Sequence, residues 1–210
     1  VQIALVGYLF SGDFPEAYLR GVEKQTEALV ANLRVFDARQ QAASQGEMID
    51  QAIDLGVDGI IVQLGLAETL KAPIDRAIAK GIKVVAFDVD LNTPQVTQVE
   101  QDHHALARLA LDQAVKDNGT KFDAGYVYIS GFTPMERRDE IWSQVKKANP
   151  GIVEKARFGT LNPPIANSVA DQASAVLRAN PGISVIFAPF DEFAKGAKIA
   201  VDEAGLASKV

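Results

Sequence analysis

The sequence predicts an α/β fold of two similar Rossmann-like lobes, each a parallel sheet flanked by helices. Apolar runs of strand length alternate with stretches of helical periodicity along all 210 residues. The apolar runs are continuous rather than interrupted by polar residues, which indicates strands that helices cover on both faces. The alternation starts afresh at Ala124, after the polar loop 118–121. This restart favours two lobes over a single doubly wound sheet or a barrel.

The elements follow one another in a regular order. Strands are predicted at 3–6, 33–37, 59–63, 84–87, 96–99, 124–130, 156–159 and 185–188. Helices are predicted at 15–30, 42–55, 73–80, 105–115, 135–147, 165–178 and 192–204. Gly81 is placed to end the third helix, because glycine readily adopts the left-handed conformation found just after helices. We expect an N-terminal lobe at 1–103 and a C-terminal lobe at 104–210, with a hinge near 102–105 and further crossovers beyond Val210.

Composition argues against several classes of protein. The net charge of −6 and the isoelectric point near 5.0 indicate a surface that repels phosphate backbones, so we expect no nucleic-acid partner. The chain has no cysteine, which excludes disulfides, thiolate catalysis and cysteine-bound zinc. No apolar run reaches the ~18 residues that a membrane-spanning helix needs. Val1 already lies in a strand pattern, so we expect that a signal peptide is not part of this chain.

Polar residues at the carboxyl ends of the strands are the candidates for a binding site, because ligands of open parallel sheets collect there. Asp88 ends the most apolar strand of the first half, and its carboxylate can accept two charged hydrogen bonds from hydroxyl groups. The alternative role is an Asx-turn, which Asp90 and Asn92 serve better. Arg137 and Arg138 lie near a helix N-terminus, where either a ligand or neighbouring acidic residues must hold a cation.

Aromatic residues also follow strand ends. Phe14 offers a flat face to the C–H side of a sugar ring, or else a hydrophobic staple at the start of a helix. Phe190 offers a second stacking surface, or else is buried between the lobes. Asp191 is expected to be the N-cap of the helix that follows it.

The two histidines are adjacent in the segment Asp102-His103-His104. Neighbouring residues on a helix point about 100° apart, so the two rings do not face one metal ion. We expect both histidines on the surface and Asp102 as the N-cap of a helix that begins near Ala105. We expect neither a metal site nor a cofactor.

One enzymatic alternative starts at segment 87–90, which resembles the nucleophile motif of haloacid dehalogenase-type phosphatases. The two residues that follow differ from that family's pattern, and its downstream lysine and acidic pair are not evident. The glycine spacing in segment 7–14 lacks the lysine and hydroxyl residue of a phosphate loop. We therefore expect a protein that is not an enzyme.

Taken in order, several segments resemble the ribose- and galactose-binding type of class I periplasmic substrate-binding proteins. The same fold forms the sensor domains of LacI-type repressors. The resemblance runs over the whole chain. The matching pieces are 3–6 with Phe14 and Gly21, 57–62, 77–85 with Asp88, Asp102, 138–142 and 186–196.

The resemblance implies roles for individual residues. Phe14 matches the aromatic residue that stacks on the sugar, and Gln63 matches a polar ligand contact. Asp88 matches the carboxylate that binds sugar hydroxyls. Arg138, four residues before Trp142, matches the ligand-binding arginine. The other pocket positions are Tyr8, Gln101, Phe132 and Phe190.

Three positions depart from the pattern of the ribose binders and make the pocket less polar. Val89 stands where those proteins have a second arginine, and Gly12 and Phe190 stand where they have asparagines. The resemblance implies a monomeric periplasmic protein that closes two lobes on a small polar ligand, a sugar or sugar-like molecule. It also implies that the protein delivers this ligand to an ABC-type permease. The first lobe would supply Phe14, Gln63 and Asp88, and the second Phe132, Arg138 and Phe190. The alternative is the ligand-sensing domain of a LacI-type transcription regulator.

Overall fold

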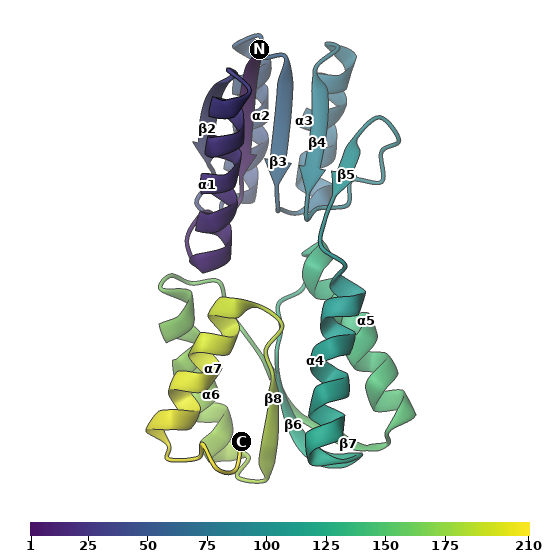
Figure 1. Cartoon of the computed structure of the whole chain (residues 1–210), viewed down its shortest axis with the longest axis vertical. Helices are drawn as coiled ribbons and strands as arrows, with labels where there is room; N and C mark the ends of the chain where they lie inside the picture. The colour runs from purple at the N-terminus through teal and green to yellow at the C-terminus, as the bar shows by residue number, and fades with distance from the viewer. The chain divides into compact units, whose positions relative to one another are not determined.

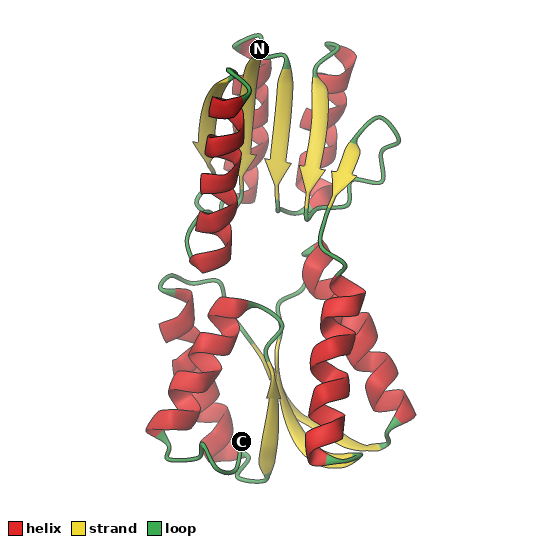
Figure 2. Ribbon diagram, viewed as in Figure 1, coloured by secondary structure: helices red, strands yellow, loops and turns green.

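A computed structural model describes residues 1–210, the whole chain. The chain folds as two compact units. The first contains Val1–Gln101 and Phe132–Pro134, and the second contains Asp102–Gly131 and Met135–Val210. Each unit is a parallel sheet flanked by helices (Figure 2). The predicted α/β class with parallel sheets is confirmed, and the hinge near 102–105 stays a prediction.

The first unit holds a five-stranded sheet of order β2-β1-β3-β4-β5. Its strands are β1 (Gln2–Gly7), β2 (Asn32–Asp37), β3 (Gly59–Gln63), β4 (Lys83–Phe87) and β5 (Thr97–Val99). Its helices are α1 (Asp13–Ala28), α2 (Ala42–Asp54) and α3 (Ala67–Ala79). Figure 1 shows α1 in front of this sheet and α2 and α3 behind it.

The second unit holds a three-stranded sheet of order β7-β6-β8. Its strands are β6 (Lys121–Val127), β7 (Gly151–Phe158) and β8 (Ile183–Phe187). Its helices are α4 (His103–Asn118), α5 (Thr133–Ala148), α6 (Ile165–Ala179) and α7 (Asp191–Glu203), and only the first two residues of α5 belong to the first unit. Helices α4 and α5 share one core with β6, whereas α6 and α7 share another with β8 (Figure 1).

The continuous apolar runs form the cores, as their pattern predicts. Ala4 and Val6 of β1 are fully buried and pack with residues of β3, β4, α2 and α3. In the second unit, Trp142 of α5 is fully buried, with its ring centroid 5.6 Å from that of Tyr126 and 5.8 Å from that of Phe187. Apolar side chains on both faces of a strand are stable only where both faces are covered.

Helix α3 begins at Ala67, six residues before the start predicted from Pro73. Proline inside a helix removes one backbone hydrogen bond, which is why the sequence suggested a helix start there. In the structure Pro73 is buried beside Gly46 of α2, and Leu70, Ile74 and Ala77 are fully buried on the same helix. Burial of this apolar face therefore outweighs the local cost of the proline. The left-handed Gly81, with a φ of 81°, follows the end of α3 as predicted.

Strand β7 begins at Gly151 rather than at the predicted 156. It lies at the edge of its sheet, and its residues alternate between more and less buried positions. Three charged residues, Glu154, Lys155 and Arg157, interrupt the apolar pattern. Charged side chains are common on edge strands, where they oppose pairing with other chains. None of the helices is both long and apolar enough to cross a membrane.

Candidate ligand-binding site

The carboxyl ends of β1, β3 and β4 lie along one edge of the first sheet, and backbone hydrogen bonds continue beyond them. The Tyr8 amide donates to the Gln63 carbonyl at 2.9 Å, and the Leu64 amide donates to the Phe87 carbonyl at 2.8 Å. The Asp88 amide donates to the Val99 carbonyl of β5 at 3.1 Å. These bonds fix the backbone of three predicted site residues, Tyr8, Gln63 and Asp88, along the same edge.

Tyr8, Gln63 and Phe132 form a buried group at the ends of β1 and β3. Their exposed fractions are 8%, 2% and 7%. The Tyr8 and Phe132 ring centroids are 5.2 Å apart, and burial raises the pKa of the Tyr8 hydroxyl. Gln63 Oε1 accepts a hydrogen bond from the Leu9 amide at 3.4 Å. Phe132 belongs to the first unit, not to the second as predicted, because segment 132–134 packs with the first unit.

Phe14 of α1 lies over the end of β4, next to a residue that the sequence analysis missed. The Phe14 ring is stacked toward Phe87 at 6.3 Å, and the Tyr18 ring stacks on Phe87 at 4.2 Å. Phe14 and Tyr18 are four residues apart, so they share one face of α1. That spacing was the signal that could have identified Tyr18. Phe14 remains 36% exposed and presents an aromatic surface.

Asp88 is a buried acid beside this aromatic group. Its residue is 4% exposed, and its φ of 56° is in the left-handed region. Burial raises the pKa of Tyr18 to about 12, and the negative charge of Asp88 adds to the shift. Asp90, the alternative turn residue, accepts the Asn92 amide at 2.9 Å and so forms the Asx-turn. The Asx-turn is thus assigned to Asp90, and the ligand role of Asp88 stays a prediction.

The remaining residues of this edge are structural supports or partly buried positions. Gln45 of α2 is fully buried and donates to the carbonyls of Gln63 and Leu64 at 3.3 and 3.0 Å, a support that no sequence motif indicated. Val89 is fully buried in the core of the first unit. Gln101, after β5, is partly buried and is the last residue of the first unit's main segment.

In the second unit, Arg138 of α5 contacts both His103 and Pro189. Its residue is 8% exposed, its Nη2 lies 3.0 Å from Nδ1 of His103, and its Nη1 donates to the Pro189 carbonyl. The prediction of a surface position for His103 is wrong, since this residue is 1% exposed. His103 faces α5 because it is the first residue of α4, which packs against α5 in one core. His104 is exposed as predicted, with Nε2 2.8 Å from Glu140.

The helix starts of the second unit bear out one predicted N-cap and contradict the other. Asp102 accepts the Ala105 amide at 2.9 Å and caps α4, which begins at His103 rather than near Ala105. The N-cap of α7 is Phe190, not Asp191, and it makes no side-chain cap bond. Its backbone is extended, and the helix begins one residue earlier than predicted. The Phe190 ring lies edge-on to Phe193, with the centroids 5.1 Å apart.

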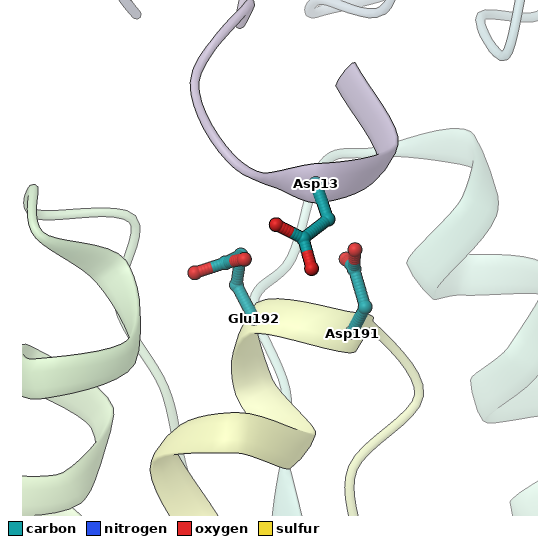
Figure 3. Close-up of side chains that lie close together, drawn as sticks. All are labelled: Asp13, Asp191 and Glu192. Atoms are coloured by element: carbon teal, nitrogen blue, oxygen red, sulfur yellow. The ribbon is translucent and has the colours of Figure 1, made fainter. Parts of the chain in front are cut away.

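Acidic residues occupy the first turns of α1 and α7 (Figure 3). Asp13 is in the first turn of α1, and Asp191 and Glu192 are in that of α7. Negative side chains are favourable there because the N-terminus of a helix carries partial positive charge. Lys195 Nζ is 2.7 Å from Glu192 Oε1. The positions of Asp13, Asp191 and Glu192 therefore suit the partial positive charge at the two helix N-termini.

The chain is similar to a known protein family and to several solved structures. A family model described as "Periplasmic binding protein domain" matches residues 3–210. The structure of a 5-methylthioribose transporter solute binding protein from Thermotoga lettingae, in complex with 5-methylthioribose, is 32% identical, with a TM-score of 0.97. A sugar ABC transporter protein from Yersinia enterocolitica is 31% identical, with a TM-score of 0.93. A periplasmic solute binding protein from Actinobacillus succinogenes with bound D-allose is 25% identical, with a TM-score of 0.89.

These matches extend over nearly all of the chain. The alignments cover 100%, 98% and 100% of it, respectively. The chain spans 66%, 63% and 76% of the lengths of the same three structures.

Proposed function

Because the chain belongs to the periplasmic binding protein domain family, we propose that it binds a sugar or sugar-like molecule and delivers it to an ABC-type permease. The family consists of binding and transport proteins rather than enzymes, which supports a role without catalysis. The similar structures at 25% identity or more are described as transporter proteins, which favours transport over the sensor of a LacI-type regulator. The proposed location is the periplasm, and the proposed state is a monomer.

The observation that carries the proposal is the buried carboxylate of Asp88 next to an aromatic surface. An ionised carboxylate accepts hydrogen bonds from two neighbouring hydroxyls, and these bonds are stronger than neutral ones. Phe14, which stacks toward Phe87 beside Asp88, offers its face to the C–H side of a sugar ring. A carboxylate and an aromatic face together suit a molecule with hydroxyls on its edge and C–H groups on its face.

The other predicted residues have complementary roles in the proposal. Gln63 and Gln101 supply amide groups for hydroxyls, and Arg138 supplies a fork of donors for ring or hydroxyl oxygens. Apolar contacts come from three aromatic residues at strand ends, Tyr8, Phe132 and Phe190.

The ligand class that we favour is a pentose with an apolar substituent, of which 5-methylthioribose is the leading example. A structure 32% identical to this chain is described as a complex with that compound. Gly12, Val89 and Phe190 replace polar residues of the ribose binders. An apolar substituent requires no hydrogen-bond partner, whereas an extra hydroxyl buried without one costs free energy.

The test is a thermal-shift screen of the full-length protein with 5-methylthioribose, D-ribose and D-allose, followed by calorimetry. A ligand at 100 times its dissociation constant stabilises a protein by about 2.7 kcal/mol, which such a screen detects. We expect 5-methylthioribose to give the largest shift. No shift with any sugar would contradict the proposal, and Mg²⁺-dependent release of phosphate from a generic ester would support the phosphatase alternative instead.

Asp88→Asn tests the carboxylate, because asparagine tolerates the left-handed backbone and keeps the shape of the side chain. Loss of charged hydrogen bonds should weaken sugar binding by about 1.5–3 kcal/mol. The matched control is Asp90→Asn, two residues away and exposed, which retains an acceptor for the Asx-turn. Equal affinities for the two variants would remove Asp88 from the site.

A further inference from the structure

The buried pair His103 and Arg138 links the start of α4 to the second turn of α5. We infer that His103 is the positioning residue that orients the Arg138 guanidinium toward the sugar. This inference rests on the proposed function, since it assigns a role in the same ligand site. Nothing in the family resemblance pointed to His103, which the sequence analysis placed on the surface.

Two acceptors on separate segments define where the guanidinium lies. His103 Nδ1 on α4 is 3.0 Å from Nη2, and the Pro189 carbonyl in the loop between β8 and α7 accepts from Nη1. The long arginine side chain has many rotamers, and its donors form a rigid planar fork. With Nη1 and Nη2 both held, the guanidinium can turn only about the line that joins them, which restricts the directions of its remaining N–H groups.

The pair also defines the chemical form of the histidine ring. A guanidinium has five donors and no acceptor, so Nδ1 of His103 must be the acceptor. A neutral imidazole with an unprotonated Nδ1 carries its hydrogen on Nε2. Protonation of Nδ1 would remove the acceptor and place a second cation against Arg138.

The position of His103 is itself fixed by the helix start. Asp102 accepts the Ala105 amide at 2.9 Å and so holds the first turn of α4. His103 is the first helical residue and is 1% exposed, so its ring has little freedom to rotate away from α5. The Asp102 cap therefore fixes the position of His103, and the His103 ring in turn orients the Arg138 guanidinium.

The geometry distinguishes three substitutions of similar polarity or size. Asparagine places Oδ1 near the position of Nδ1, because both atoms are bonded to Cγ. Glutamine carries its amide one bond further out, near the position of Nε2. Leucine fills the volume and accepts no hydrogen bond. A positioning role therefore predicts rescue by His103→Asn only, whereas a mere packing role predicts that His103→Leu is tolerated best.

The test is calorimetric titration of the full-length variants with 5-methylthioribose. His103→Leu and His103→Gln should weaken binding about 10-fold or more, as loss of a hydrogen bond to a charged group does. His103→Asn should stay within about threefold of the unaltered protein, because it restores the acceptor. The control is His104→Asn, on the adjacent exposed residue, with unchanged affinity. Thermal unfolding of each variant separates loss of affinity from loss of folded protein.

A second measurement reads the ring directly in the ligand-free protein. The chain has two histidines, so nitrogen-15 spectra of their rings are simple to assign with the His104→Asn variant. We expect one of the two histidine rings to be neutral with an unprotonated Nδ1. The signals of this ring should be absent from the spectrum of His103→Asn. A protonated Nδ1 on His103 would overturn the inference, whatever the titrations show.

The outcomes separate the inference from the proposal beneath it. If Arg138→Gln abolishes binding and His103→Leu does not alter it, the positioning role is wrong and the proposed function stands. If Arg138→Gln is also without effect, Arg138 is not a ligand residue. The ligand role of Arg138 and the positioning role of His103 are then both wrong. If the unaltered protein binds neither 5-methylthioribose, D-ribose nor D-allose, the proposed function fails and the inference fails with it.

Discussion

Gly196 lies where α7 packs most closely against α6, and replacing it by alanine tests how rigidly α7 is held. A Cβ on Gly196 would lie 2.5 Å from the carbonyl oxygen of Ala166 and 2.7 Å from Cβ of Val169. Both neighbours belong to α6, and one of them is backbone, so neither moves without shifting a helix. The start of α7 directly follows Pro189, which accepts a hydrogen bond from Arg138, and Phe190, a predicted site residue. A shift of α7 would therefore move both residues.

Two opposing contributions set the magnitude for Gly196→Ala. An added methyl group in a well-packed core costs about 1–3 kcal/mol. Alanine is favoured over glycine inside a helix by about 0.8–1.0 kcal/mol. Because the Cβ would lie so close to backbone, we expect a packing cost in the upper part of the range of about 1–3 kcal/mol. Subtracting the helix-propensity gain leaves a net destabilisation of about 1–2 kcal/mol.

Urea unfolding followed by tryptophan fluorescence is the appropriate assay. Trp142 is the chain's single tryptophan, is fully buried, and belongs to the same unit as Gly196. The control is Gly21→Ala on α1, where a Cβ would meet nothing within 4 Å. That control should gain up to about 1 kcal/mol from helix propensity alone.

Opposite signs for the two variants are the expected result. If Gly196→Ala is as stable as the unaltered protein, the close approach of α6 and α7 does not limit packing, and our reasoning is refuted. If it is destabilised and also weakens 5-methylthioribose binding, the start of α7 contributes to ligand affinity.

Three further predictions concern charge, capping and stacking. Burial alone would raise the pKa of Glu154, but hydrogen bonds from Arg157, Lys146 and Trp142 outweigh it and lower the pKa from 4.5 to about 2. The stabilisation from Glu154 is therefore present above about pH 4.5 and is lost as the pH falls through 2. Glu154→Gln should accordingly differ from the unaltered protein in urea unfolding at pH 7, and much less at pH 2. Asp102→Ala should lower the free energy of unfolding by about 1 kcal/mol through loss of the α4 cap, and an unchanged urea midpoint would count against that cap. Phe14→Ala should weaken sugar binding by about 0.5–1.5 kcal/mol by calorimetry, and full affinity in that variant would exclude stacking by Phe14.

The fold was predictable because both sheets are built from buried parallel strands. A strand covered on both faces needs a continuous apolar run, and this run is visible in the sequence at β1, β3 and β4. The errors fall where tertiary packing overrides the local signal. The charged edge strand β7 was predicted too short, and α3 was predicted to start at the proline that it buries in its interior.

The positions of candidate residues were predictable where a residue directly follows a strand. Asp88 follows β4 directly, and any parallel sheet brings that position to the ligand edge. His103 could not be identified in this way. Whether the first residue of a helix points inward depends on how α4 packs against α5, and no short-range pattern in the sequence encodes that angle.

The backbone conformation of Asp88 bears on the role of its carboxylate. A left-handed φ of 56° is unusual for a residue other than glycine and costs free energy, although aspartate tolerates it better than most residues. Glycine would adopt this turn without strain but would bring no carboxylate. The strand end is held in place regardless, because the Asp88 amide bonds to β5 at 3.1 Å. A strained and buried acid therefore stands where glycine would suit the backbone better, and this favours a role for its carboxylate in binding over one in the stability of the turn.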